Sequence, residues 1–263
     1  MLDVFSFGGG VQSTAALVLA AQGDLAVSTF LFANVGDDSE HPATLRYVRD
    51  VAMPYAQTHH LTLLELRRCK RDGSMPTLLE EVVNPTKKGD WIPVYLGGGP
   101  PGIRGCTSQF KIAVVARWLR QQGATRADPA RVHLGISLDE FTRMRTASGI
   151  AYETLVYPLI HRRLTRQDCV AIIEGAGLSV PPKSACWFCP FHQVRQWQAM
   201  YRDEPELFAQ AVALEATIQA KRARFGKNAA YLTGQGRSLA RVVGTDVQEP
   251  LFPTTCESGY CMT

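Results

Sequence analysis

Three consecutive glycines, Gly8 to Gly10, stand where an apolar run ends and a second, helix-like apolar segment begins. Glycine allows positive φ angles and close approach of the backbone to a ligand. The start of a helix adds unpaired N–H groups and a partial positive charge, so such a turn is typical of a phosphate site. A plain turn would need only one glycine. We predict a phosphate site, with contacts from Ser6, Gly8, Gly9, Gly10, Gln12, Ser13 and Thr14.

The two commonest phosphate-binding loops do not fit this stretch. The P-loop needs a lysine followed by Ser or Thr, and no lysine lies between Gly8 and Thr14. The dinucleotide fingerprint needs a further glycine where this chain has Ser13. The glycine turn therefore indicates another type of phosphate site.

Three of the seven cysteines occur in turn-like surroundings. Cys106 lies in a glycine-rich approach to a helix, and Cys186 and Cys189 form a Cys-x-x-Cys pair before Pro190. Two thiolates at this spacing can hold one metal ion or two irons of a cluster. The alternatives are a redox dithiol, which usually opens a helix, and structural zinc, which wants four ligands in two pairs. We predict an iron–sulfur cluster of the 4Fe-4S type on Cys106, Cys186 and Cys189, which leaves one iron open for chemistry.

The other cysteines have less specific surroundings. Cys69 and Cys169 have the pattern of buried, unreactive thiols. Cys256 and Cys261 are near the C-terminus, and we expect one of them either to complete the cluster or to carry a persulfide to the nucleotide. A disordered tail with incidental cysteines is the alternative. His192 is a further candidate ligand, although a hydrogen-bonded surface histidine is the commoner case.

Charged and polar residues follow two of the β-rich runs. Glu140 and Arg143 are three residues apart, so they would share a helical face as a solvated ion pair or as part of a site. In a site, Arg143 and Lys111 would spread the charge of nucleotide phosphates during reaction. A loop with Asn34 and Gly36 follows the second run, where we expect either a contact to the nucleoside or an ordinary polar turn.

Alternating strands and helices must position these residues. Short β-rich runs alternate with helical patterns, which predicts an α/β protein with a parallel, twisted, Rossmann-like sheet and helices on both faces. We expect strands at 2–7, 28–33, 61–66, 132–137 and 154–157, and helices at 11–22, 42–52, 111–122 and 166–176.

Composition and changes along the chain suggest its organisation. The 263 residues, 46% hydrophobic and 20% charged, suit a globular protein with a sizeable core. After Pro181-Pro182 the alternation of strand and helix patterns gives way to a cysteine turn and a helical stretch. We therefore expect a nucleotide-binding domain at 1–180 and a cysteine-bearing helical extension at 181–263. The absence of a long apolar run and of a signal-peptide pattern predicts a cytoplasmic protein with no membrane partner. A formal net charge of +4 permits a nucleic-acid partner without demanding one.

The glycine turn resembles the pyrophosphatase loop (PP-loop) of the adenine nucleotide alpha hydrolases, usually Ser-Gly-Gly-x-Asp-Ser. Here Gly8 replaces the Ser and Gln12 the Asp, which weakens any role that needs a carboxylate at position 12. The further motifs follow the order of phosphoadenylylsulfate (PAPS) reductase-like ATP pyrophosphatases. Among these we favour the DNA phosphorothioation proteins, such as DndC and SspD, because the Cys-x-x-Cys pair follows the nucleotide core and precedes a helical extension. The similar segments are Asn34-Val35-Gly36, Cys106-Thr107 with Lys111, 135–143, Tyr157-Pro158-Leu159 and the cysteine turn.

This resemblance implies an ATP-dependent sulfurtransferase that splits ATP into AMP and pyrophosphate. AMP would be placed on an acceptor oxygen and then displaced by sulfur. The implied cofactors are ATP, Mg²⁺ and the iron–sulfur cluster. The implied partners are a cysteine desulfurase, nucleic acid with DNA favoured over tRNA, and other subunits of a modification complex. The alternatives are a tRNA thiolation enzyme, a sulfonucleotide (PAPS or APS) reductase, and a nucleotide-binding regulatory module without turnover.

Overall fold

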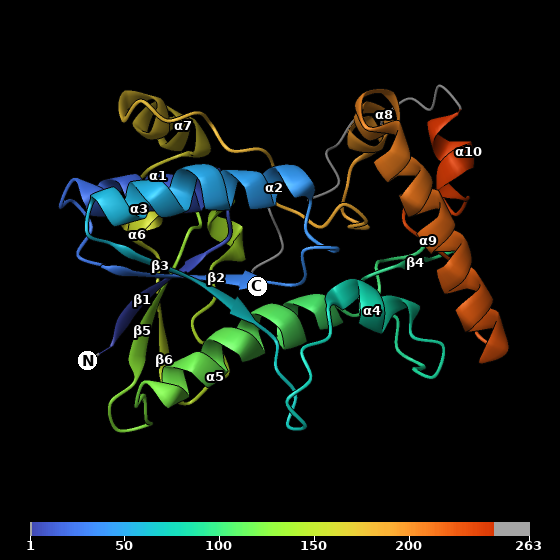
Figure 1. Ribbon diagram of the computed structural model, residues 1–263, viewed down its shortest axis with the longest axis horizontal. Helices are drawn as coiled ribbons and strands as arrows, with labels where there is room; N and C mark the ends of the chain where they lie inside the picture. Colours follow the sequence, from blue (N-terminus) through green and yellow to red (C-terminus); the bar gives the residue numbers. More distant parts are fainter. Residues whose placement is uncertain (1, 245–263) are drawn as a thin grey trace.

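A five-stranded sheet, in which every pair of neighbouring strands is parallel, forms the centre of the molecule (Figure 1). The computed structural model describes residues 2–244. The strand order β3-β2-β1-β5-β6 confirms the predicted α/β class with a parallel sheet, and each strand overlaps its predicted run. The strands are β1 (Asp3–Phe7), β2 (Thr29–Asn34), β3 (Thr62–Arg67), β5 (Ala130–Leu134) and β6 (Glu153–Val156).

Side chains of β1 and β2 alternate between two apolar layers. Phe5 and Phe30 pack in one layer with ring centroids 5.3 Å apart, whereas Val4 and Leu31 belong to the other. Burial on both faces explains the nearly continuous apolar runs in these strands. Helices α1, α2, α3 and α7 cover the first layer and α5 the second (Figure 1). Their bounds are α1 (Val11–Ala21), α2 (Pro42–Tyr47), α3 (Met53–Thr58), α7 (Arg166–Gly175) and α5 (Ala113–Gln121).

Four short elements complete this part. Two of them are π-helical: η1 continues α2 and η2 leads into α5. Such i→i+5 turns are uncommon and often occur at functional sites. The four elements are η1 (Val48–Ala52), η2 (Cys106–Ile112), the 3₁₀ helix η3 (Leu138–Arg143) and α6 (Pro158–His161).

A third apolar cluster lies away from the sheet. It joins residues of the stretch 78–110 with residues of 185–239, so this core is built from both sides of the domain boundary expected at 180. Helix α9 (Pro205–Arg224) lies in the stretch where the sequence suggested a helical extension, whereas the remaining elements of this region were not expected. These are α4 (Leu78–Val83), α8 (Val194–Asp203), α10 (Leu239–Val243) and a two-stranded antiparallel sheet of β4 (Tyr95–Leu96) and β7 (Ala230–Tyr231). Within residues 2–244, every helix is too short or too polar to cross a bilayer.

Candidate nucleotide site

The glycine turn lies between the carboxyl end of β1 and the first residue of α1. Gly10 is the N-cap of α1, and its N–H donates to Ser13 Oγ at 3.1 Å. Gly9 has a φ of +74°, and a Cβ there would lie 3.0 Å from Val48 and 3.2 Å from Thr44. Gly9 therefore packs the turn against the neighbouring helices, while Gly8 and Gly10 face a cavity.

This cavity has a volume of about 580 Å³, within the range that suits a small-molecule ligand. It lies between β1 and β5, where the strand order reverses, and ligands of open α/β sheets bind beyond the strand ends at such a point. Eight predicted site residues line it together: Ser6, Gly8, Gly10, Gln12, Ser13, Lys111, Glu140 and Arg143. Polar residues outside the predicted set of site residues also line it: Asp139, Arg166, Lys183, Ser184, Gln193, Arg195 and Gln196.

Positive charge predominates in the cavity lining. Five basic residues face two acidic ones, and the N-terminus of the 11-residue helix α1 adds further positive potential. Glu140 and Arg143 form a buried ion pair. Burial raises the pKa of Glu140, and the Arg143 guanidinium opposes this effect. Lys111 is also buried, with its Nζ 3.8 Å from Glu40 Oε1. The basic side chains of the lining are Lys111, Arg143, Arg166, Lys183 and Arg195.

Gln12 holds a neighbouring arginine at the cavity. Its Oε1 accepts from Arg166 Nη1 at 3.3 Å, and its Nε2 donates to Ser137 Oγ at 3.4 Å. The backbone N–H of Arg166 donates to Asp139 Oδ1 at 2.9 Å, which fixes the start of α7 at the cavity. The residue that stands where the resembling loops have a carboxylate thus supports a cation.

The stretch 182–196 forms one wall of the cavity. Ser184 Oγ donates to the carbonyl of Gly8, and Lys183 Nζ donates to Gln196 Oε1 at 2.9 Å. The sequence offered a weak sign of this wall, because Lys183-Ser184 stands between two prolines and the cysteine pair. Nothing in the local pattern says that this stretch meets a glycine turn far away in the chain.

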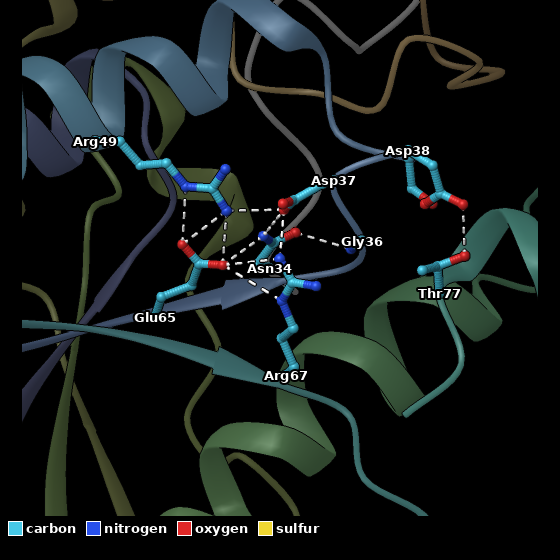
Figure 2. Close-up of polar contacts among 9 residues, drawn as sticks. Asn34, Gly36, Asp37, Asp38, Arg49, Glu65, Arg67 and Thr77 are labelled. Carbon is cyan, nitrogen blue, oxygen red and sulfur yellow. Dashed lines mark hydrogen bonds and ion pairs between the residues drawn. The ribbon is translucent and has the colours of Figure 1, made fainter. Parts of the chain in front are cut away.

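Asn34, Gly36 and Thr14 lie outside the cavity lining. Figure 2 shows Asn34 among charged side chains, and its Nδ2 donates to Asp37 at 2.8 Å and to Glu65 at 2.7 Å. Gly36 N–H donates to Asn34 Oδ1, and a Cβ on Gly36 would lie 2.5 Å from Thr77 Cβ. In this structure Asn34 and Gly36 shape the loop after β2, and their contact with a nucleoside stays a prediction.

Two arginines complete the charged network (Figure 2). Arg49 contacts Glu65 at 2.9 Å and Asp37 at 2.8 Å, and Arg67 contacts the same two carboxylates. Hydrogen bonding to Arg49 is the largest of the effects that lower the pKa of Asp37 to about 2. We call Asn34, Asp37, Arg49, Glu65 and Arg67 the charged network.

The predicted cluster ligands share one region of the molecule. Cys186 and Cys189 belong to the third apolar cluster, and Cys106 packs against it. The Cys189 N–H donates to the Cys186 carbonyl at 3.1 Å, so the pair forms a turn. The backbone of Cys186 forms an isolated antiparallel β-bridge with Glu40 in the loop after β2. Cys169 is fully buried elsewhere, and burial raises the pKa of its thiol to about 12, in keeping with an unreactive cysteine.

Thiolates are suitable donors for iron, so the chemistry of Cys106, Cys186 and Cys189 fits the predicted cluster. Among the described residues, no three His, Cys, Asp or Glu side chains are grouped so that they could hold a metal ion. Cys256 and Cys261 lie outside the described residues. The cluster and its fourth ligand stay predictions.

Fold and site together define a parallel α/β protein with a basic cavity at the switch point of its sheet. No family model matches the chain, and searches of curated proteins and of solved structures gave no significant match.

Proposed function

We propose that the protein is an ATP pyrophosphatase that adenylylates an acceptor oxygen for sulfur incorporation, with the DNA backbone as the acceptor. The observation that carries this proposal is the cavity. It joins a glycine turn, a helix N-terminus and five basic side chains in a volume suited to a nucleotide.

The triphosphate is the part of ATP that fits this charge. Gly8, Gly10 and the first turn of α1 would surround the β- and γ-phosphates, because the N–H groups of the first helical turn and the helix dipole favour negative charge. Lys111 and Arg143 would lie near the α-phosphate. Both are buried in the lining, where a cation interacts more strongly with developing charge than it does in water.

The proposed reaction proceeds in two displacements. The acceptor oxygen attacks the α-phosphorus, the bond to the bridging oxygen of the β-phosphate breaks, and pyrophosphate leaves. The AMP group is now bound to the acceptor oxygen. A sulfur nucleophile then attacks the acceptor atom that carries this oxygen, and AMP leaves together with the oxygen. The sulfur would come as a persulfide from a cysteine desulfurase partner, and a second thiol would then reduce the S–S bond left on the product, becoming a disulfide. A phosphate site without the P-loop lysine favours this cut over γ-phosphoryl transfer.

The chain has side chains with donor atoms of the kind that both implied cofactors need. Asp139 is an acidic residue in the cavity lining, so its carboxylate would hold the Mg²⁺ of the ATP complex. Cys106, Cys186 and Cys189 would hold the iron–sulfur cluster, which when bound would supply an iron able to bind sulfide.

Product analysis tests this proposal. The protein is prepared without oxygen and incubated with α-labelled ATP, a cysteine desulfurase and cysteine, with duplex DNA, tRNA or no acceptor. We expect AMP and pyrophosphate, with turnover raised by DNA. ADP as the main product would exclude the mechanism. Stimulation by tRNA alone would show that the acceptor is tRNA and not DNA. Sulfite released from a sulfonucleotide would identify a reductase, and binding without any cleavage would identify a regulatory module.

A further inference from the structure

A second hollow lies beside α5. Its volume is about 600 Å³, and residues 66–71, at the end of β3 and just beyond it, form one side, while η2 and α5 form the other. Lys111 of η2 lines the nucleotide cavity, whereas Gln109 and Ala113 line this hollow. We call it the basic groove. Its charged lining residues are Arg67, Arg68, Lys70, Arg71 and Arg117.

The basic groove has more positive charge than its neighbours neutralise. Its lining contains five basic residues and no acidic one, and of these only Arg67 is balanced within the charged network, by Asp37 and Glu65. Arg68 and Lys70 share a single buried carboxylate, Glu81, at 3.1 and 2.7 Å. Arg117 is exposed and donates to a backbone carbonyl, which carries no net charge, and Arg71 is exposed. A polyanion would supply the missing negative charge.

The positive surface continues across α5. A neighbouring hollow of about 610 Å³ has Arg117 in common with the basic groove and adds Arg120, again without an acidic residue. The Arg120 guanidinium lies over the ring of Tyr152, 5.8 Å from its centroid. Two adjoining basic hollows provide more surface than a single small anion needs, so the ligand they suit is a charged polymer.

The basic groove also begins at the same edge of the sheet as the nucleotide cavity. Arg67 is the last residue of β3, and the carboxyl ends of all five parallel strands face this edge. Lys111 and Arg117 are six residues apart on a continuous helical stretch, which is about 9 Å along a helix axis. A polymer in the groove would therefore pass near the opening of the cavity.

We propose that the basic groove binds the phosphodiester backbone of duplex DNA and leads it toward the nucleotide cavity. The choice of DNA rests on the proposed function. The groove contacts phosphates, so binding depends on salt and varies little with base sequence.

Charge reversal tests the groove. We compare the whole protein with Arg71→Glu/Arg117→Glu, and with Lys87→Glu/Arg224→Glu as a matched control of the same net charge. Lys87 and Arg224 are exposed and lie outside the groove lining. Fluorescence anisotropy with a labelled DNA duplex, repeated at several salt concentrations, gives the affinity and its salt slope. A parallel titration uses tRNA, and calorimetry measures ATP binding.

In the groove variant we expect DNA affinity to fall about tenfold or more and the salt slope to decrease by about two, with ATP binding unchanged. The control should bind DNA like the wild type. Wild-type DNA affinity in the groove variant, equal losses in both variants, no DNA binding by the wild type, or a preference for tRNA would overturn the inference. Failure of ATP cleavage between the α- and β-phosphates would instead reject the proposed function, whatever the groove does.

Discussion

The cavity at the glycine turn and the charged network both lie at the carboxyl edge of the sheet, yet their charges are organised differently. In the charged network, two carboxylates contact two guanidinium groups, so its charges are balanced within the protein (Figure 2). In the cavity, five basic residues face two acidic ones around an open volume. Polar residues at a strand end are therefore a weak guide to a ligand site. Excess charge beside a cavity is what distinguishes the proposed site from the balanced network.

The largest expected effect comes from breaking the buried pair in the cavity. Arg143→Leu leaves Glu140 buried without its cation, so we expect a loss of about 3–5 kcal/mol in the free energy of unfolding. Glu140→Leu/Arg143→Leu removes both charges and should recover much of that stability. In both variants ATP affinity should be at least about tenfold lower than in the wild type, because a charged hydrogen bond contributes about 1.5–3 kcal/mol. Urea unfolding measures the change in stability, and calorimetry measures the change in ATP affinity. Wild-type ATP affinity in the double variant would show that Glu140 and Arg143 do not contribute to ATP binding.

Two neighbouring glycines should separate stability from binding. Gly9→Ala places a Cβ 3.0 Å from Val48 at a positive φ, and we expect a loss of about 1–3 kcal/mol in stability. At Gly10 a Cβ would lie 3.5 Å from Ser184 with an ordinary φ, so Gly10→Ala should unfold like the wild type but bind ATP more weakly. If Gly9→Ala kept full stability and lost ATP binding, Gly9 would be the direct phosphate contact.

The charged network should respond in the opposite way to the cavity. Arg49→Met removes contacts to Asp37 and Glu65, both partly exposed, so we expect stability to fall by about 1 kcal/mol. ATP affinity should not change, because Arg49 lies outside the cavity lining. Arg166→Met is the matched variant: it should reduce ATP affinity and leave stability nearly unchanged. A loss of ATP binding in Arg49→Met would extend the site to the loop after β2.

The smallest expected effect is a pH dependence from Asp37. Its pKa falls from 3.8 to about 2 on folding, so between these values the unfolded chain binds more protons than the folded one. The resulting stabilisation is present above about pH 4 and is lost as the pH falls toward 2. Asp37→Asn should make the stability less dependent on pH in this window. Urea unfolding of both proteins between pH 2 and pH 5 measures the difference, and parallel pH profiles would contradict the assignment.

The sequence predicted the sheet well because strands buried on both faces read as continuous apolar runs. It also predicted the cavity residues that follow β1 and β5, since those ends are neighbours in the observed order. It did not predict the wall at 182–196 or the two-residue strands β4 and β7, because contacts between distant segments define them. The sequence leaves both roles open for Asn34, ligand contact and polar turn, because turn-forming and ligand-binding residues are of the same types.

The hydrogen bond from Ser184 to Gly8 has a consequence for synthesis of the chain. The two residues are 176 positions apart, so the glycine turn exists long before its wall is made. At a translation rate of about 5–20 residues per second, that interval is roughly 9 to 35 s. We expect a nascent chain to bind nucleotide weakly during this time and to gain a complete site only after residue 184 has left the ribosome.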